Sequence, residues 1–139
     1  QAGAGVSLPR TGTIFVSVRD GDKKELVELA RVLTSMGFHL TATSGTALFL
    51  ANAGLEVRRL SKLNDPGVTV IDLMESGEIK LIINTPSGKR PRADENKIRR
   101  HALARGLPCI TTMAGAHASV AGIQAEQKGD LQVRALQDL

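Results

Sequence analysis

The fold is decided by the stretch FHLTATSGTALFLA, which spans residues 38–51. Its first part, Phe38 to Thr43, mixes apolar and β-branched residues and predicts a strand, whereas Ala47 to Ala51 has the composition of a helix. The turn Thr43-Ser44-Gly45-Thr46 joins the two. Small residues let backbone N–H groups approach a ligand at a positively polarised helix N-terminus, so the turn predicts a phosphate site. Ser and Thr are also ordinary helix caps, so a capping role stays open.

Strand-like and helical patterns alternate along the rest of the chain. Short apolar or alternating runs predict strands at residues 13–18, 38–43, 55–60, 80–84 and 108–112. A helix with Asp22 as N-cap and Glu25 completing a capping box should end at Gly37. Its buried stripe is predicted to comprise Leu26, Leu29, Ala30 and Leu33, and further helices are predicted over residues 47–54, 70–75, 94–105 and 116–126.

Strands and helices that take turns along a chain form right-handed crossovers and a parallel sheet. We therefore predict an α/β fold: a doubly wound, Rossmann-like domain of three layers with a five-stranded parallel sheet. Ligands of such sheets bind at the carboxyl ends of the strands, near the point where the strand order reverses. The polar residues that follow the five predicted strands are Arg19 to Lys23, Thr43 to Thr46, Ser61 and Lys62, Asn84 to Lys89, and Thr111 and Thr112.

Length and composition limit the class of protein. A chain of 139 residues with 42% hydrophobic residues suits one compact domain, with residues 1–10 as a linker or N-terminal extension and residues 11–139 as the domain. Cys109 is the single cysteine, and its apolar neighbours predict a small core residue in a reducing compartment. No apolar run reaches membrane-spanning length, and the first residues lack the pattern of a signal peptide. We expect a cytoplasmic protein without membrane contact.

The net charge of +4 raises nucleic acid as a partner. Because Trp and Tyr are absent and only three Phe occur, the chain offers no stacking platform for bases, and we expect no nucleic acid. The densest basic stretch, residues 89–100, also contains Asp94 and Glu95. It is interpreted as a solvated loop and helix face, with an anion-attracting pocket rim as the alternative.

Several motifs agree in order and spacing with one known family: VSVRDGDK at residues 16–23, ATSGTA at 42–47, GEIKLIINTPSG at 77–88, IRRHAL at 98–103 and PCITT at 108–112. The chain resembles the methylglyoxal-synthase-like domain, and more closely the C-terminal allosteric domain of the carbamoyl-phosphate synthase large subunit. The resemblance extends from about Pro9 into the final helix. It implies a regulatory domain of an ATP-dependent ligase in pyrimidine and arginine biosynthesis.

The resemblance also implies a ligand and its contacts. In such synthases the domain binds UMP as inhibitor or IMP as activator, and ornithine activates some members, with Thr111 as a possible contributor to its site. Pro86 stands where nucleotide-responsive members often have Thr, so a hydroxyl and a backbone N–H donor are missing at the position of the ribose contact. The absence of Trp counts against N-acetylglutamate, the effector of mitochondrial relatives. The residues assigned to the phosphate and ribose are Ser17, Lys23, Thr43, Ser44, Gly45, Thr46, Lys62 and Asn84, with Leu63, Val70, Thr85 and Ser87 near the base or ribose.

Catalysis is the alternative within the same family. Methylglyoxal synthase uses an Asp general base and a His after strand one, but Gly67 and Arg19 stand at those positions here, so a lyase acting on dihydroxyacetone phosphate is the second hypothesis. Asp72 is interpreted as a helix N-terminal residue. The three histidines share no metal-ligand spacing, so neither a metal nor a cofactor is expected. The expected partners are the effector, the ATP-grasp domains of the same chain and the glutaminase small subunit.

Overall fold

The computed structural model describes Pro9 and residues 11–88 and 92–137, with side chains up to residue 129. The extension predicted at residues 1–10 lies outside these residues except for Pro9, and so do residues 89–91 of the basic stretch. The elements in chain order are β1 (Thr13–Ser17), the 3₁₀ turn η2 (Asp20–Asp22), α1 (Lys23–Ser35), β2 (His39–Ala42), α2 (Ser44–Asn52), β3 (Arg58–Arg59), α3 (Val70–Glu75), β4 (Ile79–Asn84), α4 (Ala93–Ala104), β5 (Cys109–Ile110) and α5 (Met113–Gln137).

The five strands form one parallel sheet in the order β3-β2-β1-β4-β5. The chain first builds outward from β1 to β3 and then returns to the other side of β1 with β4, so the order reverses between β1 and β4. At the carboxyl ends of these two strands Ser17 pairs with Asn84. The predicted doubly wound fold is confirmed, and its switch point lies at this pair.

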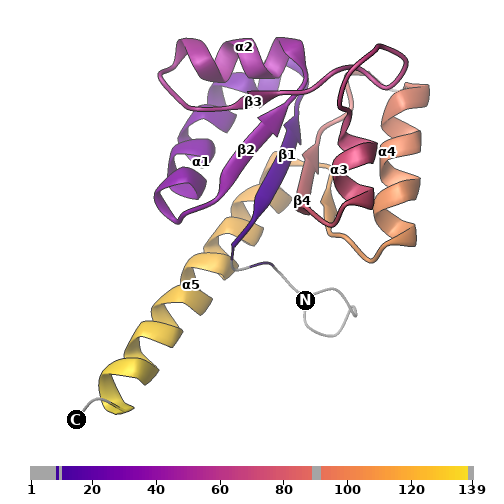
Figure 1. Cartoon of the computed structure of the whole chain (residues 1–139). Helices are drawn as coiled ribbons and strands as arrows, with labels where there is room; N and C mark the ends of the chain where they lie inside the picture. Colours follow the sequence, from indigo (N-terminus) through magenta and orange to yellow (C-terminus); the bar gives the residue numbers. More distant parts are fainter. Residues whose placement is uncertain (1–8, 10, 89–91, 138–139) are drawn as a thin grey trace.

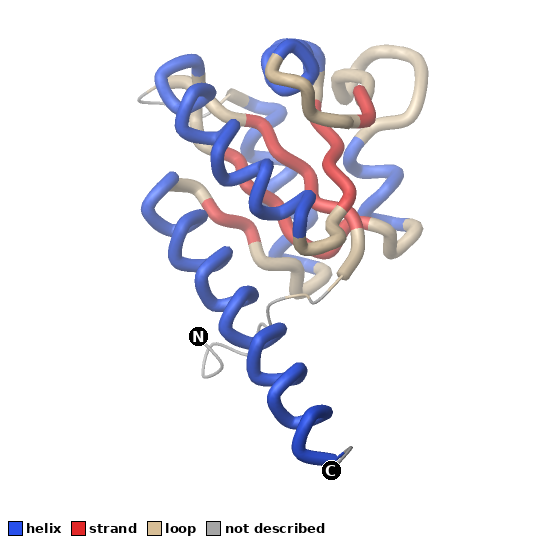
Figure 2. Tube along the Cα trace, turned by 90° about the vertical axis from the view of Figure 1, so that its left-hand side faces the viewer, coloured by secondary structure: helices blue, strands red, loops and turns tan. Residues whose placement is uncertain are grey.

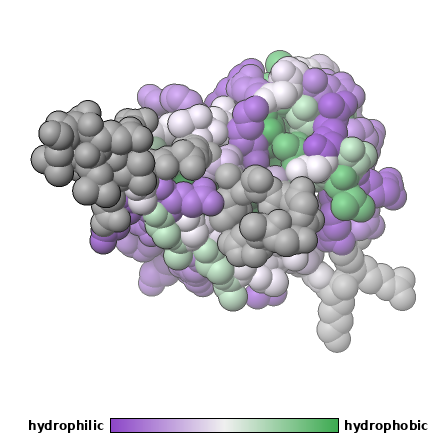
Figure 3. Space-filling view, turned by 90° about the horizontal axis from the view of Figure 1, so that it is seen from below, coloured by the Kyte–Doolittle hydropathy of each residue, from purple (hydrophilic) through white to green (hydrophobic). Residues whose placement is uncertain are grey.

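Helices cover both faces of the sheet (Figures 1 and 2). Ile14 and Val16 of β1 belong to a core shared with α1, α2 and α5, whereas Phe15 points to a second core shared with α3 and α4. This alternation is the period-two pattern of a strand buried on both sides. Seen from below, the described residues present a mostly hydrophilic surface with small apolar areas (Figure 3). The large apolar side chains exposed among the described residues are Leu48, Phe49, Val68 and Leu103.

The predicted capping box of α1 is wrong. Asp22 occupies the N-cap position but makes no side-chain cap bond, because its carboxylate accepts a hydrogen bond from Arg19 Nε at 3.0 Å. Glu25 is 2.5 Å from His117 Nε2 on α5 and so joins two helices instead. The predicted apolar stripe of α1 is confirmed, since its four members are buried.

The limits of two predicted strands and of the last helix differ most from those observed. Only Arg58–Arg59 pair as β3, where residues 55–60 were expected, because Leu55 N–H still bonds Leu50 O and closes the end of α2. Strand β5 stops at Ile110, and Thr112 Oγ1 accepts from Gly115 N–H at the start of α5. Helix α5 continues to Gln137, well past the expected residue 126, and projects beyond the sheet (Figure 1). Cys109 is only half-buried, because β5 is an edge strand.

Candidate functional site

A cavity of about 630 Å³ lies at the carboxyl ends of the central strands. Segments far apart in sequence meet there: the end of β1 with η2, the start of α2, Lys62, the loop after β4 and the start of α4. Its lining residues are Ser17, Val18, Arg19, Asp20, Gly21, Lys23, Thr43, Ser44, Gly45, Thr46, Lys62, Thr85, Ser87, Arg92 and Glu95. Residues from each of the four groups expected after strands one to four therefore meet in one cavity at the switch point.

The N-terminus of α2 opens into this cavity without a side-chain cap. Thr43 is extended at the N-cap position, with φ −83° and ψ 169°, and its hydroxyl makes no cap hydrogen bond. Its carbonyl accepts the first helical bond from Ala47 N–H at 2.8 Å. The alternative that Thr43 caps the helix is therefore wrong in this structure. An uncapped N-terminus presents backbone N–H groups and positive partial charge to an anion.

Lys23 places an ammonium group over the same helix end. Its Nζ lies so near Gly45 that a Cβ at that position would be 3.2 Å away, which shows why a residue without a side chain suits the turn. Lys23 is only 17% exposed, and its Nζ donates to Asp20 Oδ1 at 2.7 Å. Asp20 itself is 95% exposed, and the hydrogen bond from Lys23 lowers the pKa of its carboxyl group. In this state Asp20 supplies the negative charge beside Lys23.

Two buried threonines hold the end of β1 in place. Thr46 Oγ1 accepts a hydrogen bond from Val18 N–H at 3.3 Å, and Thr85 Oγ1 accepts from Arg19 N–H at 3.0 Å. Both hydroxyls still have a hydrogen to donate. These side chains therefore link the loops around the cavity and can also donate to a ligand.

A smaller cavity of about 210 Å³ adjoins the first, since Ser17, Thr43 and Lys62 line both. Apolar side chains line part of it: Phe15, Leu63, Val70 and Ile98. Asn84 lines it too, is 2% exposed, and its Oδ1 has no hydrogen-bond partner among the described residues. A buried carbonyl oxygen without a partner is costly, and a hydroxyl or N–H group of a ligand would satisfy it.

The resemblance assigned no ligand contact to Arg92 or Glu95, although both line the two cavities. Arg92 belongs to the basic stretch whose alternative interpretation was a pocket rim, and its position agrees with that alternative. Glu95 accepts backbone hydrogen bonds from Arg92 N–H at 2.7 Å and from Ser87 N–H at 3.2 Å. It thereby ties the loop after β4 to the start of α4. A glutamate at the third position of a helix is a known capping signal, which could have revealed this residue.

Thr111 is the expected site residue that the structure does not place here. It follows β5 and is not among the residues that line either cavity. Strand β5 is an edge strand two positions from β1, which separates its end from the switch point. The remaining assigned residues line one or both cavities.

The position expected for a catalytic base has a backbone suited to glycine. Gly67 has φ +112°, and a Cβ there would collide with Ser61 Oγ. Asp72 accepts a hydrogen bond from Thr69 N–H at 2.9 Å in the capping box of α3, which confirms its structural interpretation. Among the described residues no group of three or more His, Cys, Asp or Glu side chains could hold a metal ion. None of the helices in the described part is long and apolar enough to cross a membrane.

Known proteins share this sequence and this architecture. The family model of the MGS-like domain matches residues 25–111, which is more than half of the chain. The chain belongs to the MGS-like domain family. Its sheet and helices also superpose on methylglyoxal synthase from Elizabethkingia anophelis with a TM-score of 0.62, at 17% identity over 81% of this chain and 79% of that one. At this identity the likeness shows the fold alone.

This MGS-like domain is similar over nearly its whole length to one kind of protein. It is 46% identical to the carbamoyl phosphate synthase large chain of Synechocystis and 45% identical to that of Rubrobacter xylanophilus, covering 99% of this chain in both cases. It is 42% identical to the C-terminal section of that large chain in Methanocaldococcus jannaschii, where it covers 23% of the relative. In the first two relatives it spans 13% of their length.

Proposed function

We propose that this MGS-like domain is the regulatory, effector-binding part of a carbamoyl-phosphate synthase large chain, and that it binds a nucleotide monophosphate such as UMP or IMP. The observation that carries the proposal is the uncapped N-terminus of α2, which faces the Lys23 ammonium inside a cavity of about 630 Å³. The similarity to large chains supports the regulatory context.

The two adjoining cavities suit the two parts of a nucleotide. The larger one offers backbone N–H groups, Lys23 and Lys62 to a phosphate. The smaller one offers the Asn84 oxygen as an acceptor for a hydroxyl or N–H group, beside the apolar side chains of Leu63 and Val70. Pro86 has neither a hydroxyl nor a backbone N–H, so Asn84 is the polar group on which recognition of the sugar depends in this proposal.

Regulation follows if the ligand prefers one state of the synthase. An effector shifts an equilibrium only by the difference between its binding free energies to the two states, and such couplings are typically about 1–3 kcal/mol. The partners that this role implies are the ATP-grasp domains of the same large chain and the glutaminase small subunit. Ornithine is a second candidate effector in this proposal, although Thr111 lies outside the two cavities.

The test is isothermal titration of UMP and IMP into the full chain and into two matched variants. Lys23→Ala should lower the affinity by about tenfold, because it removes one charge-assisted hydrogen bond. Lys24→Ala removes the same charge from the neighbouring exposed position outside the cavity, and it should change the affinity less than twofold. Equal losses in the two variants, or no nucleotide binding by the folded wild-type chain, would contradict the proposal.

The lyase hypothesis has its own assay. Conversion of dihydroxyacetone phosphate to methylglyoxal requires a positioned base, and Gly67 provides none. We expect no product above the rate without protein. Turnover by the wild-type chain would show that the site transforms its ligand.

A further inference from the structure

A third cavity, of about 420 Å³, extends the cavity of about 630 Å³ toward the β3 edge of the sheet. Ser44 and Lys62 line both cavities, so the two spaces adjoin at the start of α2. Arg59, Ser61, Asp65 and Pro66 are among the other residues around it. The motifs that predicted the phosphate site gave no role to this space.

The wall of this third cavity is held by hydrogen bonds within the loop after β3. Ser61 N–H donates to Val68 O at 2.9 Å, and Ser61 Oγ donates to Pro66 O at 2.8 Å. Asp65 N–H donates to Lys62 O at 3.0 Å. These bonds close the loop on itself beside Lys62. The cationic residue shared by the two cavities therefore comes from a well-defined turn.

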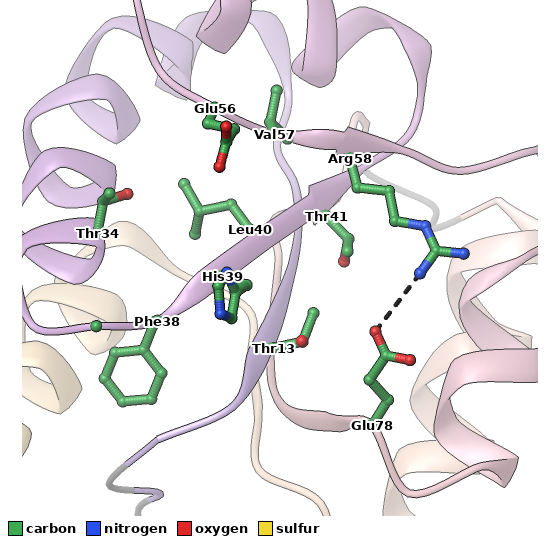
Figure 4. A pocket seen from close by; sticks show the side chains of 11 residues that line it. Thr13, Thr34, Phe38, His39, Leu40, Thr41, Glu56, Val57, Arg58 and Glu78 are labelled. Carbon is green, nitrogen blue, oxygen red and sulfur yellow. Dashed lines mark ion pairs between the residues drawn. The ribbon is translucent and has the colours of Figure 1, made fainter.

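The two arginines of β3 have different surroundings. Arg58 reaches toward Glu78 on the other side of the strand, with Nη1 and Oε2 3.5 Å apart, and lines a separate cavity of about 530 Å³ (Figure 4). Arg59 lines the third cavity. Among the ion pairs found in the described residues, none involves Arg59 or Lys62. Asp65 is the acidic residue of this lining, so the local charge balance is positive.

We propose that Arg59 and Lys62 form a second anion subsite, and that the chain accepts ligands with a diphosphate group. The first phosphoryl group would lie at the N-terminus of α2 and the second between Lys62 and Arg59, with Lys62 contacting both. A guanidinium group binds phosphoryl oxygens in a bidentate manner and stays charged at any physiological pH. This inference rests on the proposed function, because it extends the same phosphate site.

The test compares inorganic phosphate with pyrophosphate by calorimetry at constant ionic strength and pH 8. The wild-type chain should bind pyrophosphate about tenfold more tightly than phosphate. Arg59→Gln should weaken pyrophosphate binding by about five- to tenfold and leave phosphate binding within about twofold, as expected for the loss of one charge-assisted contact. Arg58→Gln is the control, since it removes the same charge from the adjacent residue, and it should leave both affinities within about twofold.

Three outcomes would overturn the inference. Equal affinities of the wild-type chain for the two anions would show that the second phosphoryl group gains no contact. Equal losses in Arg58→Gln and Arg59→Gln would show a general charge effect. No binding of either anion would refute the subsite, and the separate titration with UMP and IMP decides whether the proposed function fails with it. A crystal of the wild-type chain with pyrophosphate tests the contact independently of any variant, because the second phosphoryl group should lie beside Arg59.

Discussion

Lys23 is the residue whose surroundings define the site most closely. Its ammonium lies over Gly45 at the start of α2 while Asp20 pairs with it from the exposed side. A ligand phosphate would have to displace this carboxylate or bind beside it, so Asp20 acts against the anion that Lys23 attracts. Ion pairs with an exposed partner contribute little to the free energy of unfolding, so Lys23 can exchange Asp20 for a phosphate at little cost in free energy.

Replacement of Asp20 should therefore strengthen anion binding. Asp20→Asn is expected to raise the affinity for inorganic phosphate by about two- to fivefold, because one competing negative charge is lost. Isothermal titration calorimetry at low salt measures this affinity for inorganic phosphate. Glu28→Gln, an exposed acid on α1 outside the cavity, is the charge-matched control. An increase of the same size in the control, or weaker phosphate binding in Asp20→Asn, would show that Asp20 does not compete with phosphate for Lys23.

The thiol of Cys109 gives a second prediction about a single residue. Burial raises the pKa of its thiol, and the nearby Arg99 guanidinium opposes the shift only in part. A raised pKa means less thiolate at neutral pH, and thiolate is the reactive form. At pH 7.5 iodoacetamide should modify Cys109 at least about fivefold more slowly in the folded chain than in urea. Equal rates would show that the thiol is neither shielded nor perturbed.

Single residues also show where sequence reasoning stops. The phosphate turn could be predicted because small residues, hydroxyls and a helix start are adjacent in sequence. Asn84 was assigned from the resemblance, but its buried oxygen without a partner is a three-dimensional fact. Glu95 appeared only as an acid among basic residues, because its bonds to two backbone N–H groups depend on how the loop after β4 folds back.

At the scale of elements, helix endings set the strand limits. In α1, Gly37 N–H bonds Thr34 O and Phe38 N–H bonds Leu33 O, and α2 ends in the same way with Gly54 and Leu55. Both glycines have positive φ, as the Schellman motif requires. The residue after each glycine belongs to the cap, so β2 begins at His39 and β3 begins later still. Apolar patterns locate strands but do not reveal that their first residues serve the preceding helix.

The cap of α3 offers a test of an element without touching the cavities. Thr69 Oγ1 accepts a hydrogen bond from Asp72 N–H at 3.4 Å, and Asp72 Oδ2 accepts one from Thr69 N–H. Thr69→Ala should lower the free energy of unfolding by about 1 kcal/mol, as measured by urea denaturation. Phosphate affinity should stay within twofold of the wild type, since Thr69 lines neither cavity. An unchanged free energy of unfolding would show that the capping box of Thr69 and Asp72 does not stabilise this helix end.

At the scale of the whole molecule, the strand order explains why these residues meet. Since the order reverses between β1 and β4, the loops after them diverge to opposite faces and leave space between them. The alternation of strands and helices predicted this arrangement, although the sequence does not specify which strands are neighbours. The length of α5 could not be predicted from the core pattern, because its final turns project beyond the sheet.

Ligand binding should also be visible in the stability of the whole domain. A ligand that binds only the native state at 100 times its Kd adds about 2.7 kcal/mol, which corresponds to a rise in Tm of about 8–10 °C for a domain of this size. Differential scanning calorimetry with UMP and IMP measures this rise in Tm. Lys23→Ala should reduce the rise at the same nucleotide concentration. An unchanged Tm at saturating nucleotide would count against binding to the native state.

The most direct measurement is a crystal structure of the full chain with UMP. The account predicts the phosphate at the N-terminus of α2, within hydrogen-bond distance of Lys23 Nζ and the backbone N–H groups of residues 44–46, with Asn84 Oδ1 accepting a hydrogen bond from the nucleoside. A nucleotide bound elsewhere, or an empty cavity at saturating UMP with Lys23 still paired to Asp20, would contradict it.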